Sequence, residues 1–233
     1  MELAIQPAYV LHRRQYLESS LLLDVFTLNN GRLSCVAKGA LSSRQNKAAL
    51  LQPLQPLLLA FTGKSGLYTL TRCEAASSAL TLQGKRLFCL YYVNELLLRL
   101  APEGEAMPSV FAWYAETLAG LQCEDAESQL RCFEVRLLRE LGIAPGFEQD
   151  ASGALILPHL RYAYTSEGQF ELSRQGSGIM GDTLLQLGAL QQDYYELEGV
   201  AKREAKILMR QLIDQALHGR ELKSRAFFAP SKN

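Results

Sequence analysis

The apolar residues of this chain change their spacing near residue 80, and that change constrains the fold more than any other feature of the sequence. Before it, short runs of β-branched and apolar residues alternate with turn residues, at residues 9–12, 20–27, 32–36, 54–61 and 67–73. Asn29-Asn30-Gly31 and the segment from Gly63 to Gly66 are hairpin signals, because Asn and Gly accept positive φ. Five short strands without intervening helices predict a small barrel, since five is the strand count of an OB-fold; a small β-sandwich is the alternative.

After residue 80 the apolar residues recur at spacings of three and four, which is typical of amphipathic helices. We predict helices at residues 87–98, 108–120, 126–141 and 193–217, with helix also resuming near Thr183. Asn94 lies on the apolar stripe of the first helix, where a hydrogen-bonded core amide is the favoured interpretation and a ligand contact is the alternative. A β-hairpin is predicted near residues 155–175, around Ser166-Glu167-Gly168.

Together these patterns predict an α+β protein with two domains. Residues 1–80 are expected to form an N-terminal five-stranded OB-fold β-barrel, and residues 81–233 a mostly helical domain with the small inserted β-hairpin. With 233 residues, of which 48% are hydrophobic, the chain can bury an ample core. Its apolar runs are far too short to span a bilayer and its first residues lack a signal-peptide pattern, so we expect no membrane association and a cytoplasmic location.

The cysteine pattern bears on disulfides and metals. The five cysteines form an odd set with no close pair: Cys35, Cys73, Cys89, Cys123 and Cys132. This spacing argues against a disulfide framework and against a zinc ribbon. We expect buried, reduced thiols, no metal site and no cofactor.

Positive charge is concentrated at the two ends of a chain whose net charge is zero. By segment, the net charge is +4 for residues 1–80, −7 for residues 103–150 and +5 for residues 202–233. No Asp or Glu occurs between Asp24 and Glu74, and within that zone a predicted strand runs into a loop that carries only cations. This loop predicts a surface that attracts a polyanion, with a solvated surface loop as the alternative. The predicted contacts are Arg32, Lys38, Arg44 and Lys47.

The last predicted helix carries a second group of cations. Lys202, Lys206 and Arg210 recur at spacings of three and four, with Arg203 beside them, and form a basic stripe. We predict that this stripe extends the polyanion surface. The alternative is a solvated helix face.

Three short patterns resemble enzyme motifs, but none predicts a catalytic site. Residues 176–181 match GxGxxG, but that fingerprint needs a parallel βαβ unit, and a helical stretch follows where the next strand should come. Gly63-Lys64-Ser65 ends like a phosphate-binding loop, but the required first glycine falls at Leu58, inside an apolar strand. The three histidines are scattered and form no hydrolytic or zinc motif. We expect no enzymatic activity.

Five blocks of sequence stand in order along nearly the whole chain. They are VLHRRQYLESSLLLDVFTLNNGRLSCVAKGA at residues 10–40, LLQPLQPLLLAF at 50–61, YYVNELLLRL at 91–100, LRCFEVRLLRELG at 130–142 and LKSRAFF at 222–228. This set resembles the RecO family of bacterial recombination and repair mediators. The resemblance implies an OB domain followed by a helical domain, and a non-enzymatic activity: binding of single- and double-stranded DNA, annealing of complementary strands coated by single-strand-binding protein (SSB), and loading of RecA together with RecR.

The resemblance also implies partners. The SSB tail is acidic and ends in an apolar residue, so its receptor needs a cation beside a hydrophobic pocket. Arg131 is the predicted contact, and Arg136 and Arg139 are weaker candidates. The alternative is that these arginines only pair with the glutamates at helical spacing, Glu127, Glu134 and Glu140. We expect a monomer associated with the nucleoid; the alternative function is a protein-binding adaptor of the repair machinery with little direct DNA affinity.

The sequence departs from the family in one respect. Many RecO proteins carry a four-cysteine zinc site between the third helix and the hairpin, whereas this chain has no cysteine after Cys132. Zinc is therefore not expected, and the hairpin must be held by packing. The predicted anchors are Tyr162, Tyr164 and Phe170, for which stacking on DNA bases is the alternative role.

Overall fold

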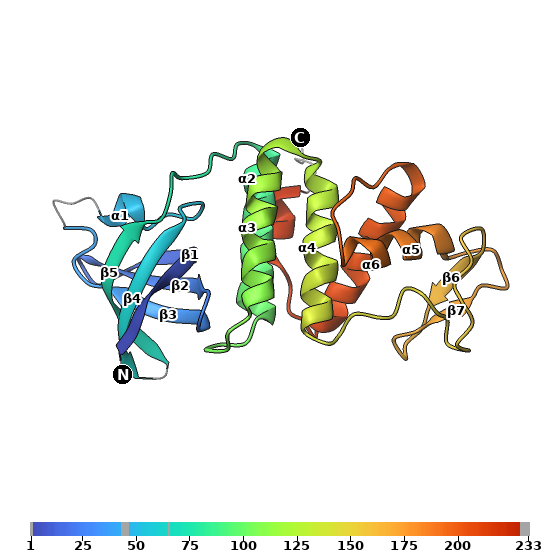
Figure 1. Cartoon of the computed structure of the whole chain (residues 1–233), viewed down its shortest axis with the longest axis horizontal. Coiled ribbons are helices and arrows are strands. Elements are labelled where there is room, and N and C mark those ends of the chain that lie inside the picture. The colour runs from blue at the N-terminus through green and yellow to red at the C-terminus, as the bar shows by residue number, and fades with distance from the viewer. Residues whose placement is uncertain (1, 43–46, 65, 229–233) are drawn as a thin grey trace. The chain divides into compact units, whose positions relative to one another are not determined.

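The computed structural model describes residues 2–42, 47–64 and 66–228 (Figure 1). The strands are β1 (Glu2–Tyr16), β2 (Ser20–Thr27), β3 (Gly31–Ala37), β4 (Leu57–Lys64), β5 (Leu67–Ala75), β6 (Arg161–Tyr164), β7 (Phe170–Leu172) and β8 (Ile179–Met180). The helices are α1 (Lys47–Leu50), α2 (Lys85–Leu100), α3 (Pro108–Cys123), α4 (Ala126–Glu140), α5 (Gly181–Leu190), α6 (Gly199–Ala216) and the 3-10 helix η1 (Lys223–Phe228).

The chain forms two compact units. The first contains Met1–Gln122 together with Leu222–Asn233, and the second contains Cys123–Glu221. The first unit thus combines the strand-rich segment with two helices of the segment that we expected to be a helical domain. The domain boundary at residue 80 stays a prediction.

The first unit is built on a closed barrel whose strands follow the order β1-β2-β3-β5-β4. β3 and β5 pair in parallel, and the other neighbours pair antiparallel. This confirms the predicted five-stranded OB-fold barrel. β1 is longer than expected: it begins at Glu2 and pairs with β2 as far as Tyr16, with a bulge between Val10 and His12.

The barrel interior is filled by inward-facing residues, because the side chains of a strand alternate between its two faces. Leu23, Val25 and Phe61 are fully buried there. The short helix α1 lies at one end of the barrel, and Leu51, which follows it, belongs to the same core (Figure 1). Lys47 was predicted to lie in a loop, whereas it begins this helix.

Aromatic rings join the outer face of the barrel to α3. The ring centroid of Tyr9 lies 5.5 Å from that of Phe111 and 5.1 Å from that of Tyr114. Asn94 of α2 is 2% exposed; its side-chain amide donates to the carbonyl of Leu11 at 2.9 Å and accepts from the Tyr114 hydroxyl at 2.7 Å. The prediction that Asn94 is a hydrogen-bonded core amide is confirmed.

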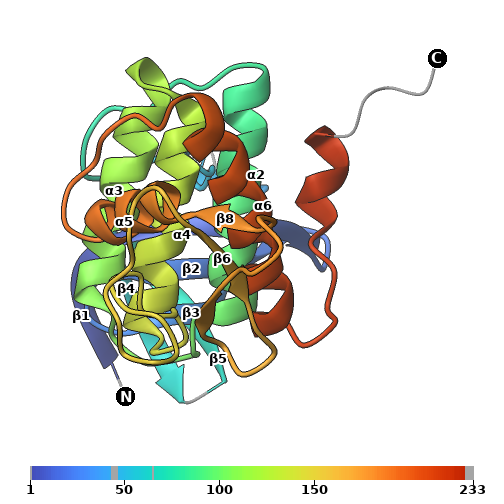
Figure 2. The same cartoon turned by 90° about the vertical axis from the view of Figure 1, so that its right-hand side faces the viewer.

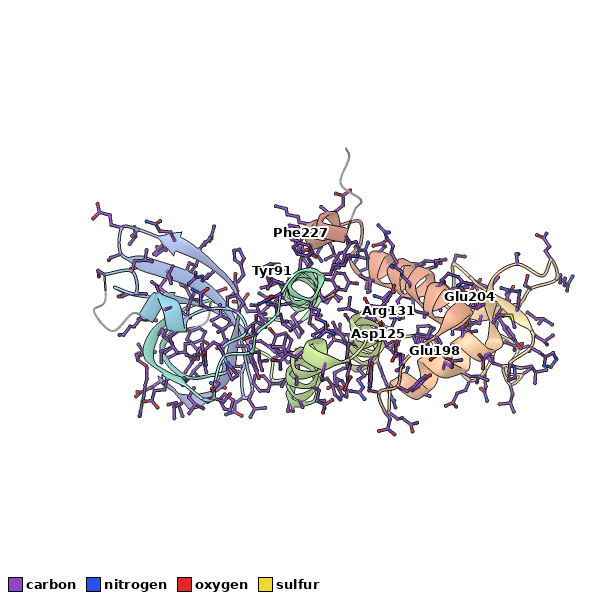
Figure 3. All side chains as sticks on the ribbon, turned by 90° about the horizontal axis from the view of Figure 1, so that it is seen from above. Tyr91, Asp125, Arg131, Glu198, Glu204 and Phe227 are labelled. Atoms are coloured by element: carbon purple, nitrogen blue, oxygen red, sulfur yellow. The ribbon has the colours of Figure 1, made fainter. Side chains whose placement is uncertain are left out.

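The C-terminal helix η1 is fixed to α2 in the first unit. The Glu95 carboxylate accepts from the backbone amides of Lys223 and Ser224 at 3.0 and 2.8 Å, and from the Ser224 hydroxyl at 2.6 Å. The ring of Phe227 lies 6.0 Å from that of Tyr91 (Figure 3). Burial raises the pKa of Glu95, but these hydrogen bonds lower it by more, so it falls below its usual value.

The second unit contains α4, α5 and α6 with a three-stranded sheet in the order β7-β6-β8 (Figure 2). β6 and β7 form the predicted hairpin, in which Tyr164 faces Phe170. Tyr162 and Phe170 are fully buried, and the Tyr164 ring lies 5.3 Å from the Phe170 ring. The predicted packing role of these three aromatics is confirmed.

The glycines of the GxGxxG pattern serve close packing. A Cβ atom on Gly178 would lie 2.3 Å from the carbonyl oxygen of Tyr162, and one on Gly181 would lie 2.0 Å from that of Leu157. β8, which lies between these two glycines, pairs antiparallel with β6. The parallel βαβ unit of a dinucleotide site is therefore not formed here, as the sequence analysis expected.

Two sequence expectations need correction. The last helix begins at Gly199 and not near residue 193, because Leu197 is held outside a helix by donating its backbone amide to the Ser128 hydroxyl at 2.9 Å. None of the five cysteines, all of which the structure describes, forms a disulfide, but Cys123 is exposed and Cys73 only partly buried, so the expectation of uniformly buried thiols was wrong for these two.

Within residues 2–42, 47–64 and 66–228, no helix is long and apolar enough to cross a membrane. In the same part of the chain, no group of three or more His, Cys, Asp or Glu side chains is placed to hold a metal ion.

Candidate nucleic-acid interface

The barrel end near α1 carries exposed cations. Lys38 follows β3 and Lys47 begins α1, and both side chains are exposed. Neither has a carboxylate partner among the residues that the structure describes. Arg44, which lies between them in the sequence, falls outside the described residues. The two lysines therefore present charge that is not neutralised by any described acid.

Arg32, the fourth predicted contact, is placed differently. Its side chain is 19% exposed, its Nε donates to the Ala101 carbonyl at 3.1 Å, and its guanidinium lies 3.8 Å from the Glu103 carboxylate. These contacts join β3 to the segment between α2 and α3. Its role in binding a polyanion stays a prediction, but its side chain is mostly buried and its charge is partly balanced by Glu103.

Two further cations at the barrel end were not singled out from the sequence. Arg13 and Arg14 lie on β1, beyond residue 12, where the predicted strand ended. Arg14 is exposed and has no carboxylate partner in the described part of the chain. Arg13 donates to the carbonyl of Ala48 at 2.7 Å and to that of Leu51 at 3.4 Å. No sequence signal marked them, because the predicted strand ended at residue 12 and both lie outside the acid-free zone between Asp24 and Glu74.

A pocket of about 410 Å³ lies between these arginines and α1. Its lining residues are Arg13, Arg14, Gln15, Leu21, Leu41, Ala48, Ala49 and Gln52. The lining thus combines two guanidinium groups, two side-chain amides and four aliphatic side chains, and it contains no acidic residue. A negatively charged ligand with an apolar or aromatic part suits such a lining.

The lysines of the α6 stripe are paired with acids. Lys202 lies 2.8 Å from the Asp125 carboxylate, and Lys206 lies 2.7 Å from that of Glu127. Burial raises the pKa of Asp125, but hydrogen bonds from Lys202 and Ser128 lower it by more, so it falls below its usual value. The hydrogen bond to Asp125 in turn raises the pKa of Lys202.

Arg210, the third member of this stripe, is exposed and has no carboxylate partner among the described residues. The two lysines contribute less net charge to the surface than the sequence suggests, whereas Arg210 contributes its full charge. The assignment of this stripe to a polyanion stays a prediction.

The three arginines of α4 lie in different environments. Arg131 is 6% exposed and pairs with Glu134 at 2.5 Å, which is the pairing that the sequence analysis kept as an alternative. Arg136 is 7% exposed and donates to the carbonyls of Leu190 and Gln192 at 3.2 and 3.0 Å. Arg139, in the last turn, is exposed. Contact of these arginines with an acidic tail stays a prediction, and Arg131 would have to leave Glu134 to make it.

Two family models match the chain. The one described as "Recombination protein O N terminal" covers residues 1–79, and the one described as "Recombination protein O C terminal" covers residues 82–226. The chain belongs to the RecO family.

Three relatives share the name "DNA repair protein RecO". The relative from Methylococcus capsulatus is 42% identical over 227 residues, which is 96% of this chain and 92% of the relative.

The other two relatives are similar in extent. The one from Dechloromonas aromatica is 39% identical over 96% of this chain and 94% of its own length, and one from Haemophilus influenzae is 40% identical over 95% of this chain and 96% of its own length. These matches confirm the resemblance drawn from the sequence blocks, and they give the chain a role in DNA repair and recombination. In a RecO protein, the barrel end with its cations is the candidate nucleic-acid interface.

Proposed function

We propose that this RecO-family protein is a non-enzymatic mediator of DNA repair that binds single- and double-stranded DNA. It anneals complementary strands coated by SSB and, with RecR, helps to load RecA. The observation that carries the proposal is the group of exposed cations at the barrel end, Arg14, Lys38 and Lys47, which have no carboxylate partner among the described residues. Arg44 belongs to the same basic segment of the sequence.

The physical mechanism is charge neutralisation. Two complementary strands repel each other through their phosphates, so a protein that binds both on basic surfaces lowers the repulsion and raises their local concentration. Cations that hold no internal partner can release the counterions of DNA without first losing an ion pair. Because phosphates carry no sequence information, binding is independent of sequence.

We assign the main DNA contacts to Lys38, Arg44 and Lys47. The stripe of Lys202, Lys206 and Arg210 has a secondary role, because its two lysines are already paired with Asp125 and Glu127. Arg32 contributes least, since it is held by Ala101 and Glu103.

For the acidic tail of SSB, we propose Arg139 as the cation of α4 that a tail can reach directly. Arg131 and Arg136 support the same region from inside the unit through their contacts with Glu134 and with the carbonyls of Leu190 and Gln192. The protein acts as a cytoplasmic, nucleoid-associated monomer.

The proposal is tested by titrating a fluorescent single-stranded oligonucleotide at several salt concentrations. Three phosphate contacts at the barrel end predict a slope of log K against log salt of about −2, and further contacts make it steeper. A flat slope with negligible affinity at low salt contradicts the proposal and favours a protein-binding adaptor. Annealing of SSB-coated complementary strands, measured beside annealing of bare strands, then tests the finer claim.

A further inference from the structure

The pocket beside Arg13 and Arg14 lies at the barrel end, and Arg13 holds one of its walls in place. Arg13 spans from β1 to α1 by donating one guanidinium nitrogen to the carbonyls of Ala48 and Leu51. This bond fixes the position of Ala48, and with it the α1 wall of the pocket. The lining also includes Leu21 of β2, which is 5% exposed, and Leu41, which is 44% exposed.

The two arginines differ in how far their guanidinium groups are available to a ligand. Arg13 is partly buried and held by its two carbonyl acceptors, so it positions the wall. Arg14 is exposed, lines the same pocket and has no carboxylate partner among the described residues. Its guanidinium can therefore bind a phosphate with two donors in one plane.

The rest of the lining suits a nucleobase. Leu21, Leu41, Ala48 and Ala49 offer aliphatic surface, and the side-chain amides of Gln15 and Gln52 offer both hydrogen-bond donors and acceptors. The volume of about 410 Å³ is within the ordinary range for pockets that hold small organic groups. Because no acidic side chain lines the pocket, it is unsuited to a cation.

We propose that this pocket holds one nucleotide of a bound single strand, with its phosphate on Arg14 and its base against Leu41 and Ala49. The inference rests on the proposed function and extends it: the strand is fixed by a base-dependent contact at one point as well as by charge along its backbone. Duplex DNA, whose bases are stacked and paired, cannot fill the pocket. The pocket therefore gives the barrel a preference for single strands.

The test compares two oligonucleotides of equal length and charge, a thymidine strand and an abasic sugar-phosphate strand, by fluorescence anisotropy. The wild-type protein should bind the thymidine strand several-fold more tightly, because a base seated against aliphatic side chains loses apolar surface to water. Ala49→Leu fills the pocket without changing charge and adds no aromatic ring. It should bring the two affinities close together by weakening only the thymidine strand.

Matched variants separate this effect from general damage. Ala112→Leu makes the same change at an exposed position of α3 and should keep the preference for thymidine. Arg14→Ala should weaken both strands and reduce the salt slope by about one contact. Arg72→Ala removes a barrel arginine that Glu74 already neutralises at 2.6 Å, so it should change the slope little. All variants must keep the thermal unfolding of the wild type.

The outcomes distinguish the inference from the function beneath it. If the wild-type protein binds both strands equally, or if Ala49→Leu keeps or increases the preference for thymidine, the pocket is not a nucleotide site, while DNA binding by charge stands. If the wild-type protein binds neither strand at low salt, the proposed function itself fails.

Discussion

The barrel end and the α6 stripe carry similar cations in the sequence but different charge in the structure. At the barrel end, Lys38 and Lys47 have no carboxylate partner among the described residues, because no acid occurs nearby in the chain. On α6, Lys202 and Lys206 are paired with Asp125 and Glu127 at the start of α4. The comparison shows that a run of cations predicts a polyanion surface only where the fold brings no acid against it.

The largest expected effect is the loss of stability on replacing Arg131, whose ion pair with Glu134 is buried. Arg131→Ala removes the guanidinium that pairs at 2.5 Å with Glu134, whose side chain is fully buried. Breaking a buried pair from one side costs about 3 to 5 kcal/mol, so the free energy of unfolding in urea should fall by that order. Arg139→Ala, an exposed change on the same helix, is the control and should cost less than about 0.5 kcal/mol. Equal stability of both variants would contradict the structural role of Arg131.

The next effect concerns the unpaired cations. Replacing Lys38, Arg44 and Lys47 together by Ala should lower the affinity for single-stranded DNA by about tenfold or more at low salt, and reduce the salt slope by up to three contacts. Stability should change little, because replacing Lys38 and Lys47, the two of these residues that the structure describes, breaks no ion pair with a described residue. Anisotropy titrations check the affinity. An affinity equal to that of the wild type would remove the barrel end from the interface.

Replacing three cations of α6 by Ala should lower the affinity for DNA by less than the barrel-end replacement does. Replacing Lys202, Lys206 and Arg210 by Ala removes two cations that are already neutralised and one that is not. The salt slope should therefore fall by about one contact, and the affinity by a few-fold. A loss as large as that of the barrel-end variant would show that the α6 lysines leave their acids to bind DNA.

The smallest expected effect is a pH dependence of stability that comes from the ion pair between Asp125 and Lys202. Because the pKa of Asp125 is lowered in the folded protein, its pairing stabilises the fold at pH values above the unfolded value of about 3.8, and this contribution is lost as the pH falls through the folded pKa. Asp125→Asn keeps an oxygen for capping Ser128 but loses the charge. Urea unfolding between pH 3 and 6 should show a stability difference from the wild type, on the order of 1 kcal/mol at pH 6, that shrinks on acidification. A difference that stays constant with pH would remove the charge of Asp125 as its cause.

Much of the fold could be predicted because its signals are local. The alternation of apolar residues and the Asn29-Asn30-Gly31 turn marked the barrel strands, and the spacing of three and four marked α2, α3 and α4. Arg13 and Arg14 were missed because residues 12–15, His-Arg-Arg-Gln, contain no apolar residue, so the predicted strand ended before them. The bond from Arg13 to α1 is a long-range contact that no local pattern encodes.

In the candidate site, too, local contacts could be predicted from the sequence and contacts that depend on tertiary packing could not. The pairing of Arg131 with Glu134 could be anticipated, since residues three apart face each other on a helix. The pairing of Lys202 with Asp125 could not, because it depends on how α6 packs against α4. The sequence thus located the cations, and tertiary structure decided which of them are neutralised.

The central claim is that the barrel-end lysines are free to bind DNA whereas the α6 lysines are held by acids. Lysine footprinting by brief acylation and mass spectrometry, with and without a single-stranded oligonucleotide, tests it directly. In the free protein Lys38 and Lys47 should react quickly, and Lys202, with a side chain 27% exposed and bonded to Asp125, should react slowly. DNA should protect Lys38 and Lys47 strongly and change Lys202 little. Strong protection of Lys202 and Lys206, with Lys38 and Lys47 unprotected, would contradict the account.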